Sequence, residues 1–278
     1  MNISEHVDSF IQEMKRLGLS NNTINSYSNC VKIFFEISKK DHPKNINEND
    51  IKKFLSNYDE SNTQRNFHSA IKKFYSICLK QNNKFKYIPY CKKSNKLPIV
   101  LSQDEVEKMF NVCKNKKHKA ILAVLYSCGL RVSELINLKW EHIDRSRMII
   151  NIIQGKGNKD RQVMLDYQLI KILEEYWREY KSKEYVFNGQ NGNLQYSKHS
   201  VLQVIKKLAY DAKIKKRVWT HLMRHNSFTH LVESGTDINL VQRLAGHSSV
   251  KTTSIYLHLS HTTISKIKSP LSQINLVD

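Results

Sequence analysis

Two histidines and an arginine are spaced to share one face of a helix in the segment THLMRHNSFTHL, residues 220–231. His221, Arg224 and His225 stand at positions i, i+3 and i+4, so a helix projects them from one side within its first turns. With Thr220 as the predicted N-cap, a helix N-terminus carrying these side chains is suited to hold a phosphate. Taken alone, the residues equally fit a core histidine beside a solvated arginine.

Two further cations occupy turns earlier in the chain. Arg131 follows Gly129 in GLRVSEL, on a turn before a helix, where a guanidinium can grip two phosphate oxygens. Lys156 stands between two glycines in QGKGNKDR and can reach a leaving-group oxygen or a base edge. In isolation, a surface ion pair explains the arginine, and a solvated hairpin lysine is the more common explanation of Lys156.

A Gly-His pair and a tyrosine complete the set in LAGHSSVKTTSIYLHLS, residues 244–260. His247 precedes Tyr256 by nine residues in a helix-like stretch. A phenolic oxygen can act as a nucleophile, and an imidazole beside it can donate a hydrogen bond. A helix end followed by an aromatic packing residue is the alternative explanation.

The charge of the chain indicates a polyanionic partner. The sequence carries 45 Lys+Arg against 25 Asp+Glu, a formal net charge of +20. Residues 1–93 hold 16 of the basic and 9 of the acidic residues, so both parts of the chain are basic. Nucleic acid is the leading partner, ahead of an anionic membrane surface, because the longest apolar stretch is too short to cross a bilayer.

The remaining composition favours a globular cytoplasmic protein. Hydrophobic residues make up 40%, and the N-terminus has no cleavable apolar segment, so no export signal is predicted. The cysteines, Cys30, Cys78, Cys91, Cys113 and Cys128, are widely spaced and are predicted to be buried thiols in a reducing compartment. The twelve histidines form no array with metal-ligand spacing, so no metal or other cofactor is predicted.

Amphipathic patterns predict four helices in the first third of the chain. They lie near residues 4–18, 20–40, 47–58 and 64–81, with Ser4 and Ser20 as N-caps and Gly18 as a stop. The second helix has an apolar stripe at Ile24, Tyr27, Val31, Phe34 and Phe35. Residues 83–101 have no period and contain two prolines and a lysine cluster, which predicts a linker and a domain boundary near Lys93.

The rest of the chain, residues 94–278, is predicted to be a second, mostly helical domain. Ser102 begins a helix with capping-box spacing to Glu105, and residues 118–129 are apolar nearly all round, which is typical of a central helix. Residues 147–166 predict an antiparallel hairpin around Lys156, and EYVFN, residues 184–188, a short strand. Further helices are expected over 167–181, 197–213, 220–235 and 237–246.

The order of these motifs resembles the tyrosine recombinase (phage integrase) family. GLRVSEL, GKGNKDR, HLMRHNSFTHL and LAGHSSVKTTSIYLHL occur in the family's order and cover essentially the whole second domain. The chain departs from the usual wording at Met223, Asn226 and Ala245, but each catalytic position has the expected residue type. The resemblance implies a mainly α fold, with a four-helix, SAM-like core-binding domain (1–93) and an α+β catalytic domain (94–278) containing a small antiparallel sheet.

The resemblance also implies the chemistry. Tyr256 attacks the scissile phosphate to form a 3'-phosphotyrosine, Arg131 and Arg224 hold the phosphate oxygens, and His247 donates a further hydrogen bond. His221 assists proton transfer, and Lys156 protonates the departing 5'-oxygen. Candidates for contacts to double-stranded DNA are Arg65, Lys72, Lys73 and Lys159.

The implied activity is site-specific recombination of duplex DNA through a Holliday junction, either in mobile-element integration or in Xer-like dimer resolution. A type IB topoisomerase-like enzyme and a DNA-binding protein with a vestigial site are the alternatives. The protein is expected to act as a homotetramer on double-stranded DNA and to be a monomer or weak oligomer when free. The last 22 residues contain apolar positions such as Ile264, Ile267 and Leu271, which predicts docking on a neighbouring subunit or on the chain's own domain.

Overall fold

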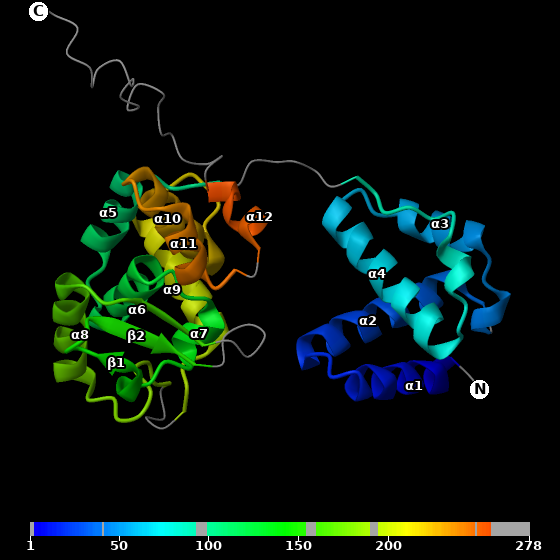
Figure 1. Cartoon of the computed structure of the whole chain (residues 1–278), viewed down its shortest axis with the longest axis horizontal. Helices are drawn as coiled ribbons and strands as arrows, with labels where there is room; N and C mark the ends of the chain where they lie inside the picture. Colours follow the sequence, from blue (N-terminus) through cyan, green and yellow to red (C-terminus); the bar gives the residue numbers. More distant parts are fainter. Residues whose placement is uncertain are drawn as a thin grey trace, which may run out of the picture. The chain divides into compact units, whose positions relative to one another are not determined.

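The computed structural model describes residues 3–40, 42–92, 99–153, 160–189, 194–247 and 249–256. The chain forms two compact units, Met1–Lys96 and Leu97–Asp278 (Figure 1). Several expectations fall outside the described residues: the boundary near Lys93, the hairpin residues Lys156 and Lys159, and the C-terminal segment 257–278. None of the described helices is both long enough and apolar enough to cross a membrane.

The first unit is built around helices that bury aromatic side chains. Its α-helices are α1 (Ile3–Arg16), α2 (Asn21–Ser38), α3 (Glu48–Ser56) and α4 (Ser61–Cys78), with 3₁₀ turns at Pro43–Asn45 and Asn82–Phe85. Phe74 of α4 meets Phe10 of α1 and Phe35 of α2 edge-on, with ring centroids 5.4 and 5.3 Å apart. Such edge-to-face pairs add specific attraction to the burial of apolar area. The predicted helical stripe of α2 is confirmed, with Tyr27 only half-buried.

The ends of these helices test the predicted caps. Ser20 Oγ accepts a hydrogen bond from the Thr23 amide at 3.2 Å, which confirms this N-cap. Gly18 has φ +69°, the left-handed conformation that ends a helix, as predicted. The Ser4 cap is wrong, because α1 already includes Ile3.

The expected linker 83–101 begins later than its sequence indicates. Phe85 and Ile88 are buried in the aromatic core of the first unit, and His68 Nε2 donates to the Ile88 carbonyl at 2.8 Å. Two isolated apolar residues have no period to mark them, so the pattern could not separate them from a solvated connection. The first unit therefore includes residues assigned to the linker.

The second unit surrounds a central buried helix. Its α-helices are α5 (Gln103–Val112), α6 (Lys116–Ser127), α7 (Val132–Ile136), α8 (Tyr167–Tyr180), α9 (Lys198–Asp211), α10 (Thr220–Glu233), α11 (Ile238–Ala245) and α12 (Val250–Thr253). Helix α6 is buried from Ala120 to Leu125 and packs against α8 and α10, which confirms its predicted central position. The capping box of α5 is also confirmed: Ser102 Oγ accepts from the Glu105 amide, and Glu105 Oε2 accepts from the Ser102 amide.

The second unit also contains a small antiparallel sheet with the strand order β1-β2-β3 (Figure 1). Strands β2 (Ile149–Ile152) and β3 (Arg161–Met164) pair with Ile150 opposite Val163, which confirms the hairpin. The short β1 (Ile143–Asp144) was not predicted; it pairs with β2 after a 3₁₀ turn at Trp140–His142. EYVFN is not a strand: it contributes only isolated bridges, Lys139 to Tyr185 and Asn188 to Gln195.

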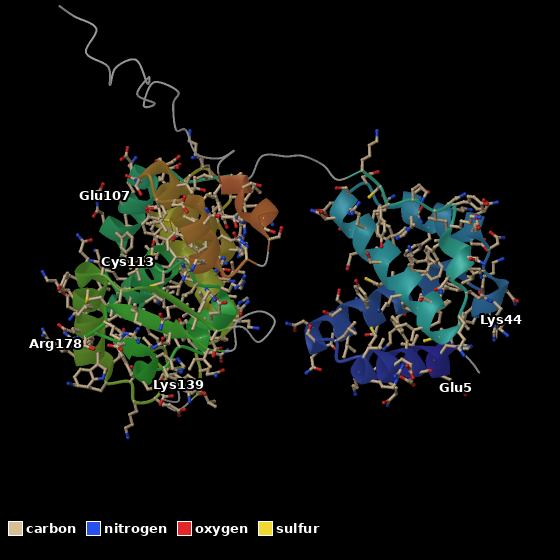
Figure 2. All side chains as sticks on the ribbon, in the orientation of Figure 1. Glu5, Lys44, Glu107, Cys113, Lys139 and Arg178 are labelled. Atoms are coloured by element: carbon tan, nitrogen blue, oxygen red, sulfur yellow. The ribbon has the colours of Figure 1, made fainter. Side chains whose placement is uncertain are left out.

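Charged side chains are distributed over both units. Lys44 in the first unit, and Glu107 and Arg178 in the second, are exposed (Figure 2). The five cysteines are free, but only Cys30, Cys113 and Cys128 are buried. The expectation that all are buried is wrong for Cys78 and Cys91, which are half-buried: Cys78 lies at the margin of the first unit's core, and Cys91 lies in the segment after α4, where its Sγ donates to the Ser61 carbonyl at 3.3 Å.

Candidate active site

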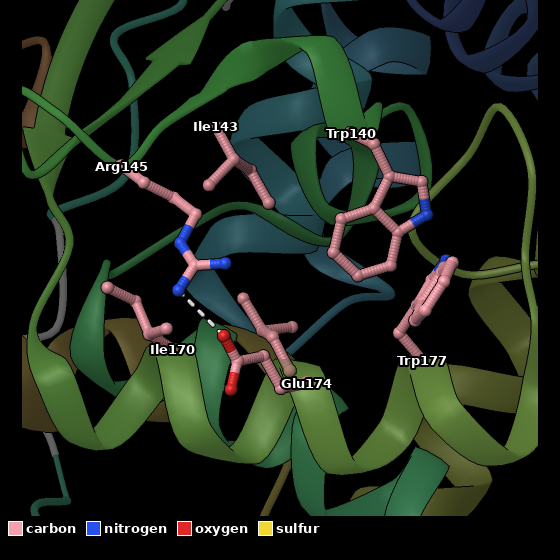
Figure 3. Close-up of a pocket in the computed structure, with 7 residues that line it drawn as sticks. Trp140, Ile143, Arg145, Ile170, Glu174 and Trp177 are labelled. Carbon is pink, nitrogen blue, oxygen red and sulfur yellow. Dashed lines mark ion pairs between the residues drawn. The ribbon is translucent and has the colours of Figure 1, made fainter.

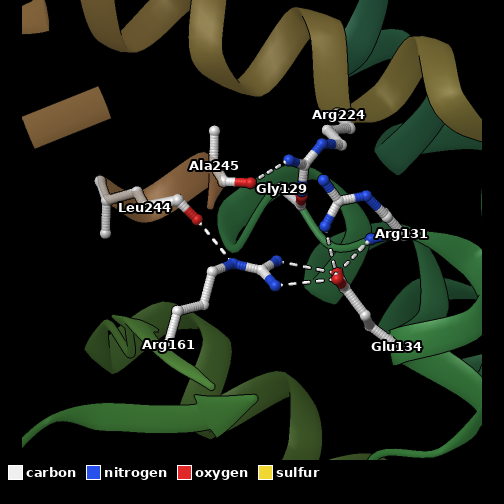
Figure 4. A network of polar contacts seen from close by, with 7 residues as sticks. All are labelled: Gly129, Arg131, Glu134, Arg161, Arg224, Leu244 and Ala245. Atoms are coloured by element: carbon white, nitrogen blue, oxygen red, sulfur yellow. Dashed lines mark hydrogen bonds and ion pairs between the residues drawn. The ribbon is translucent and has the colours of Figure 1, made fainter. Parts of the chain in front are cut away.

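Arg131 begins α7 and presents its guanidinium at the edge of the site. Its side chain is 20% exposed, and its Nη1 lies 2.7 Å from Glu134 Oε1 (Figure 4). The Arg131 amide also donates to Glu134 Oε2 at 2.8 Å. The acidic side chain therefore fixes both the backbone and the guanidinium of Arg131, as a capping residue does at a helix N-terminus.

Arg224 is almost completely buried in α10, with 1% exposure. Its Nη1 donates to the Gly129 carbonyl at 2.6 Å, and its Nη2 donates to the Ala245 carbonyl. One guanidinium thus joins the turn before Arg131 to the end of α11 (Figure 4). Burial, and then the nearby charges of Arg131 and Arg161, lower the Arg224 pKa to about 10, so the group stays cationic at neutral pH.

Glu134 and Arg161 lie beneath these arginines, and sequence reasoning gave neither a role. Arg161 Nη1 and Nη2 donate to Glu134 Oε1 and Oε2, both at 2.8 Å, in a bidentate pair. Burial alone would raise the pKa of the Glu134 carboxyl, but hydrogen bonds and charge from Arg161, with those from Arg131, lower it to about 2. Twenty-seven positions separate the two residues, and no local pattern signals such a pair.

The histidines at the start of α10 lie in different surroundings from the arginine they flank. His221 is exposed, although partial desolvation, and then the charges of His225 and Arg224, lower its pKa to about 4. The His225 ring lies 4.7 Å from that of His221 and 5.8 Å from that of Tyr256, centroid to centroid. The predicted Thr220 cap is wrong: Trp219 occupies the N-cap position and makes no side-chain cap hydrogen bond, so α10 begins one residue earlier than expected.

His247 follows the left-handed Gly246, φ +60°, which ends α11. Its Nδ1 lies 3.0 Å from Thr253 Oγ1 on α12, within hydrogen-bond distance. Its ring stacks nearly parallel to that of Tyr256, with centroids 6.1 Å apart and 13° between planes. Desolvation, and then the positive charges of Arg224 and Arg131, lower the His247 pKa to about 4, so the ring is neutral at pH 7.

Tyr256 is 1% exposed and packs in a small apolar cluster with Phe228 of α10 and Val241 and Ala245 of α11. Burial raises the pKa of its hydroxyl, while the charges of Arg224 and Arg131 act in the opposite direction. The phenol is therefore protonated at neutral pH, and any attack by its oxygen needs a proton acceptor. The cations that lower its pKa would stabilise the phenolate formed on attack.

Two family models match most of the chain. The model of the phage integrase family matches residues 100–263, and that of the phage integrase N-terminal SAM-like domain matches residues 7–84. The chain belongs to the phage integrase family. It is a site-specific tyrosine recombinase, an enzyme that breaks and rejoins DNA strands. The mainly α fold with a SAM-like first domain is confirmed.

Relatives and a solved structure extend the likeness over most of the chain. Tyrosine recombinase XerD of Oceanobacillus iheyensis is 33% identical over 87% of this chain and 89% of its own. A putative integrase/recombinase of Sinorhizobium fredii is 38% identical over 73% of this chain and 66% of its own. The crystal structure of the XerH site-specific recombinase bound to palindromic difH substrate is 26% identical, with a TM-score of 0.73, and covers 86% of this chain and 76% of that one.

Three of the four DNA-contact candidates, Arg65, Lys72 and Lys73, lie on α4 of the first unit, and Lys159 lies outside the described residues. Arg65 is half-buried: its Nη1 donates to the Cys91 carbonyl at 2.8 Å, and its Cζ lies 4.9 Å from the Tyr90 ring centre. Lys72 is exposed and Lys73 is half-buried. Arg65 thus has a structural role in holding the chain after α4, and Lys72 is the more available for a phosphate.

The hollows in the described part of the recombinase's second unit include two that differ in their lining. One, of about 700 Å³, is lined by the candidates Arg131 and His247 together with Arg161, Gln242 and Arg243. The other, of about 320 Å³, lies between Trp140 and Trp177 beside the Arg145–Glu174 ion pair at 2.7 Å (Figure 3). The described lining of this second hollow includes none of the candidate catalytic residues, so the hollow lined by Arg131 and His247 is the one relevant to the chemistry.

The lowered pKa of His247 predicts a loss of stability in mild acid. The unfolded chain takes up a proton on this ring below about pH 6.5, whereas the folded recombinase does so only below about pH 4. The free energy of unfolding therefore falls as the pH decreases between these values. Urea denaturation at a series of pH values should show a shallower decline for His247→Gln than for the natural protein; identical slopes would contradict the shift.

Proposed function

We propose that the recombinase cuts and rejoins duplex DNA through a covalent 3'-phosphotyrosine formed on Tyr256. One observation carries this proposal: the phenol lies against His247, where the charges of Arg224 and Arg131 both act to lower its pKa. A nucleophile, a hydrogen-bond donor and two phosphate-binding cations are the groups that displacement at a phosphodiester requires.

The proposed step is a transesterification in which each residue has one role. The Tyr256 oxygen bonds to phosphorus as the bond to the 5'-oxygen breaks, while Arg131 and Arg224 bind the non-bridging oxygens. His247, neutral at pH 7, donates a hydrogen bond to the same phosphate. His221, also neutral, accepts or relays the phenol proton, and Lys156 gives a proton to the departing oxygen. The ester bond is conserved in the phosphotyrosine, so rejoining needs no external energy source.

The number of protein copies in the complex follows from the number of phosphodiester bonds that must break. Exchange of both strands between two duplexes cleaves four phosphodiesters, so four copies of Tyr256 are required. We infer a homotetramer on DNA acting through a Holliday junction, with the free protein a monomer or weak oligomer. A lambda integrase tetramer bound to a Holliday junction has the same fold, with a TM-score of 0.80 at 16% identity.

Double-stranded DNA is the proposed partner of both units. The net charge of +20 would favour a partner that releases many counterions on binding. We assign the first unit, with Lys72 and Lys73 of α4, to DNA binding, and the second to catalysis as well as binding. Lys159, three positions after Lys156 in the sequence, is assigned to the DNA backbone on charge alone.

Sequencing of DNA trapped on the protein in cells tests this function. Cells expressing the recombinase are lysed in denaturant, and DNA that stays attached to the purified protein is sequenced. The proposal predicts read ends at one recurrent sequence, with the protein joined to the 3' end. Adducts without sequence preference would favour a topoisomerase-like enzyme, and the absence of adducts a DNA-binding protein with a vestigial site.

A further inference from the structure

Arg161, the first residue of β3, connects three separate segments of the catalytic unit. Its Nη1 and Nη2 atoms form the bidentate pair with Glu134 on α7, and its Nε donates to the Leu244 carbonyl on α11 at 2.8 Å (Figure 4). The side chain is 7% exposed, so these contacts use three of its nitrogen donors in a largely desolvated setting. Only a guanidinium offers donors in this geometry.

The first consequence concerns the Glu134 carboxylate that Arg161 shares with Arg131. Its two oxygens accept from Arg161 at 2.8 Å, and they also accept from the Arg131 guanidinium and amide. The pKa of about 2 shows that the carboxylate is charged at every pH relevant to activity. Without Arg161, Arg131 becomes the sole cationic partner of the carboxylate, which loses the bidentate contact that holds it in the position from which it orients the Arg131 guanidinium.

The second consequence concerns the turn that carries His247. Leu244 and Ala245 end α11, and their carbonyls accept from Arg161 and Arg224 respectively. A Cβ atom on Gly246 would lie 3.0 Å from Arg161 Cδ, so the glycine at this left-handed position also lets Arg161 pass beneath the turn. The methylene chain of Arg161 therefore fixes the position of Gly246, the residue immediately before His247.

We propose that Arg161 is a positioning residue that fixes Arg131 and the Gly246-His247 turn in one geometry for catalysis. This inference rests on the proposed function, because it assigns Arg161 to support the residues placed there in phosphate binding. Arg161 acts through Glu134 and Leu244 and does not itself contact the phosphate. Its loss should slow cleavage of bound DNA far more than it weakens binding.

The test compares Arg161→Ala with Arg178→Ala, a matched control. Arg178 on α8 is 72% exposed and lies outside the hollow that contains Arg131 and His247, so its removal subtracts the same charge without breaking the buried pair. Single-turnover cleavage of a nicked duplex carrying the recovered site is measured at saturating protein, and affinity by gel shift. We expect Arg161→Ala to cleave at least ~10²-fold more slowly than Arg178→Ala, as loss of a preorganised electrostatic contact typically does. The two affinities should agree within ~3-fold.

Two further measurements separate positioning from a general loss of folding. Guanidinium ion added to Arg161→Ala should restore the cleavage rate at least ~10-fold, whereas sodium chloride at equal ionic strength should not, because a planar fork is needed. Arg161→Lys, which keeps the charge but not the fork, should fold with a melting temperature close to that of the natural protein and still cleave slowly. Cleavage by Arg161→Ala at the control rate, an equal loss of binding and cleavage, or no response to guanidinium would each overturn the inference.

A second variant separates failure of the Arg161 inference from failure of the proposed nucleophile. Tyr256→Phe is assayed on the same substrate. If that variant forms no adduct while Arg161→Ala cleaves at the control rate, the positioning role alone is wrong. If Tyr256→Phe still forms an adduct, the nucleophile itself is misassigned, whatever Arg161 does.

Discussion

Replacement of Tyr256 by phenylalanine is expected to abolish covalent attachment of the recombinase to DNA while leaving duplex binding intact. Only one oxygen is removed. The ring keeps its place in the apolar cluster, 5.6 Å from Phe228 and stacked on His247, so the fold should be preserved. The adduct is measured on a denaturing gel after incubation with labelled duplex, and no band above background is expected.

Tyr210→Phe is the matched control for this prediction. Tyr210 lies on α9 and is 83% exposed, so its hydroxyl should be dispensable for both fold and chemistry. The control should form adduct at the rate of the natural protein. An adduct formed by Tyr256→Phe, or its loss in Tyr210→Phe, would contradict the assignment.

Arg224→Lys should reduce cleavage by at least ~10²-fold at saturating protein, with a change in DNA affinity of only ~3-fold or less. The lysine keeps the positive charge, but one ammonium cannot donate to the Gly129 and Ala245 carbonyls and also bind phosphate in a fixed plane. Alanine is the poorer choice, because it would leave both carbonyls without their donor in a buried site.

Arg178→Lys on α8 provides the comparison for Arg224→Lys. The Arg178 side chain is 72% exposed and lies 3.9 Å from Glu174, so its substitution should change neither rate nor affinity. Rates come from single-turnover cleavage and affinities from gel shifts of the same preparations. Parallel losses of affinity and cleavage in Arg224→Lys would instead indicate that Arg224 only holds the two carbonyl segments together.

Much of the fold was predictable because local periodicity and caps agree with the packing. The stripe of α2 is half-buried at Tyr27 and buried at Ile24, Val31, Phe34 and Phe35, since a 3.6-residue period places these side chains on one side. The hairpin of β2 and β3 was predictable because two β-rich runs flank a glycine-containing stretch of sequence. The helical stripe and the hairpin each depend on residues that lie close together in the sequence.

Features that depend on distant parts of the chain were missed. Phe85 and Ile88 join the core of the first unit without any period of their own, and the two residues of β1 acquire strand structure only by pairing with β2. Thr220 has the right residue type for a cap, but α10 begins with it inside the first turn. Tertiary contacts decide such ends, and local preference is weak beside them.

The active site also combines features that the sequence predicted with features that it did not. The identities of Arg131, Arg224, His247 and Tyr256 follow from motifs in order, but the sequence does not indicate that Arg224 is buried against two carbonyl groups. It also gives no sign of the Glu134–Arg161 pair, which joins segments 27 positions apart. Hydrogen-bond geometry between separate elements is set by the packing of the sheet against α7 and α11.

Mass spectrometry of the trapped protein–DNA complex tests the central claim most directly. The covalent complex is digested with nuclease and then trypsin, which should release the peptide TTSIYLHLSHTTISK, residues 252–266, from the natural sequence. The account predicts that a nucleotide 3'-phosphate remains on this peptide and that fragmentation places it on Tyr256. A nucleotide found on any other residue, with Tyr256 unmodified, would contradict it.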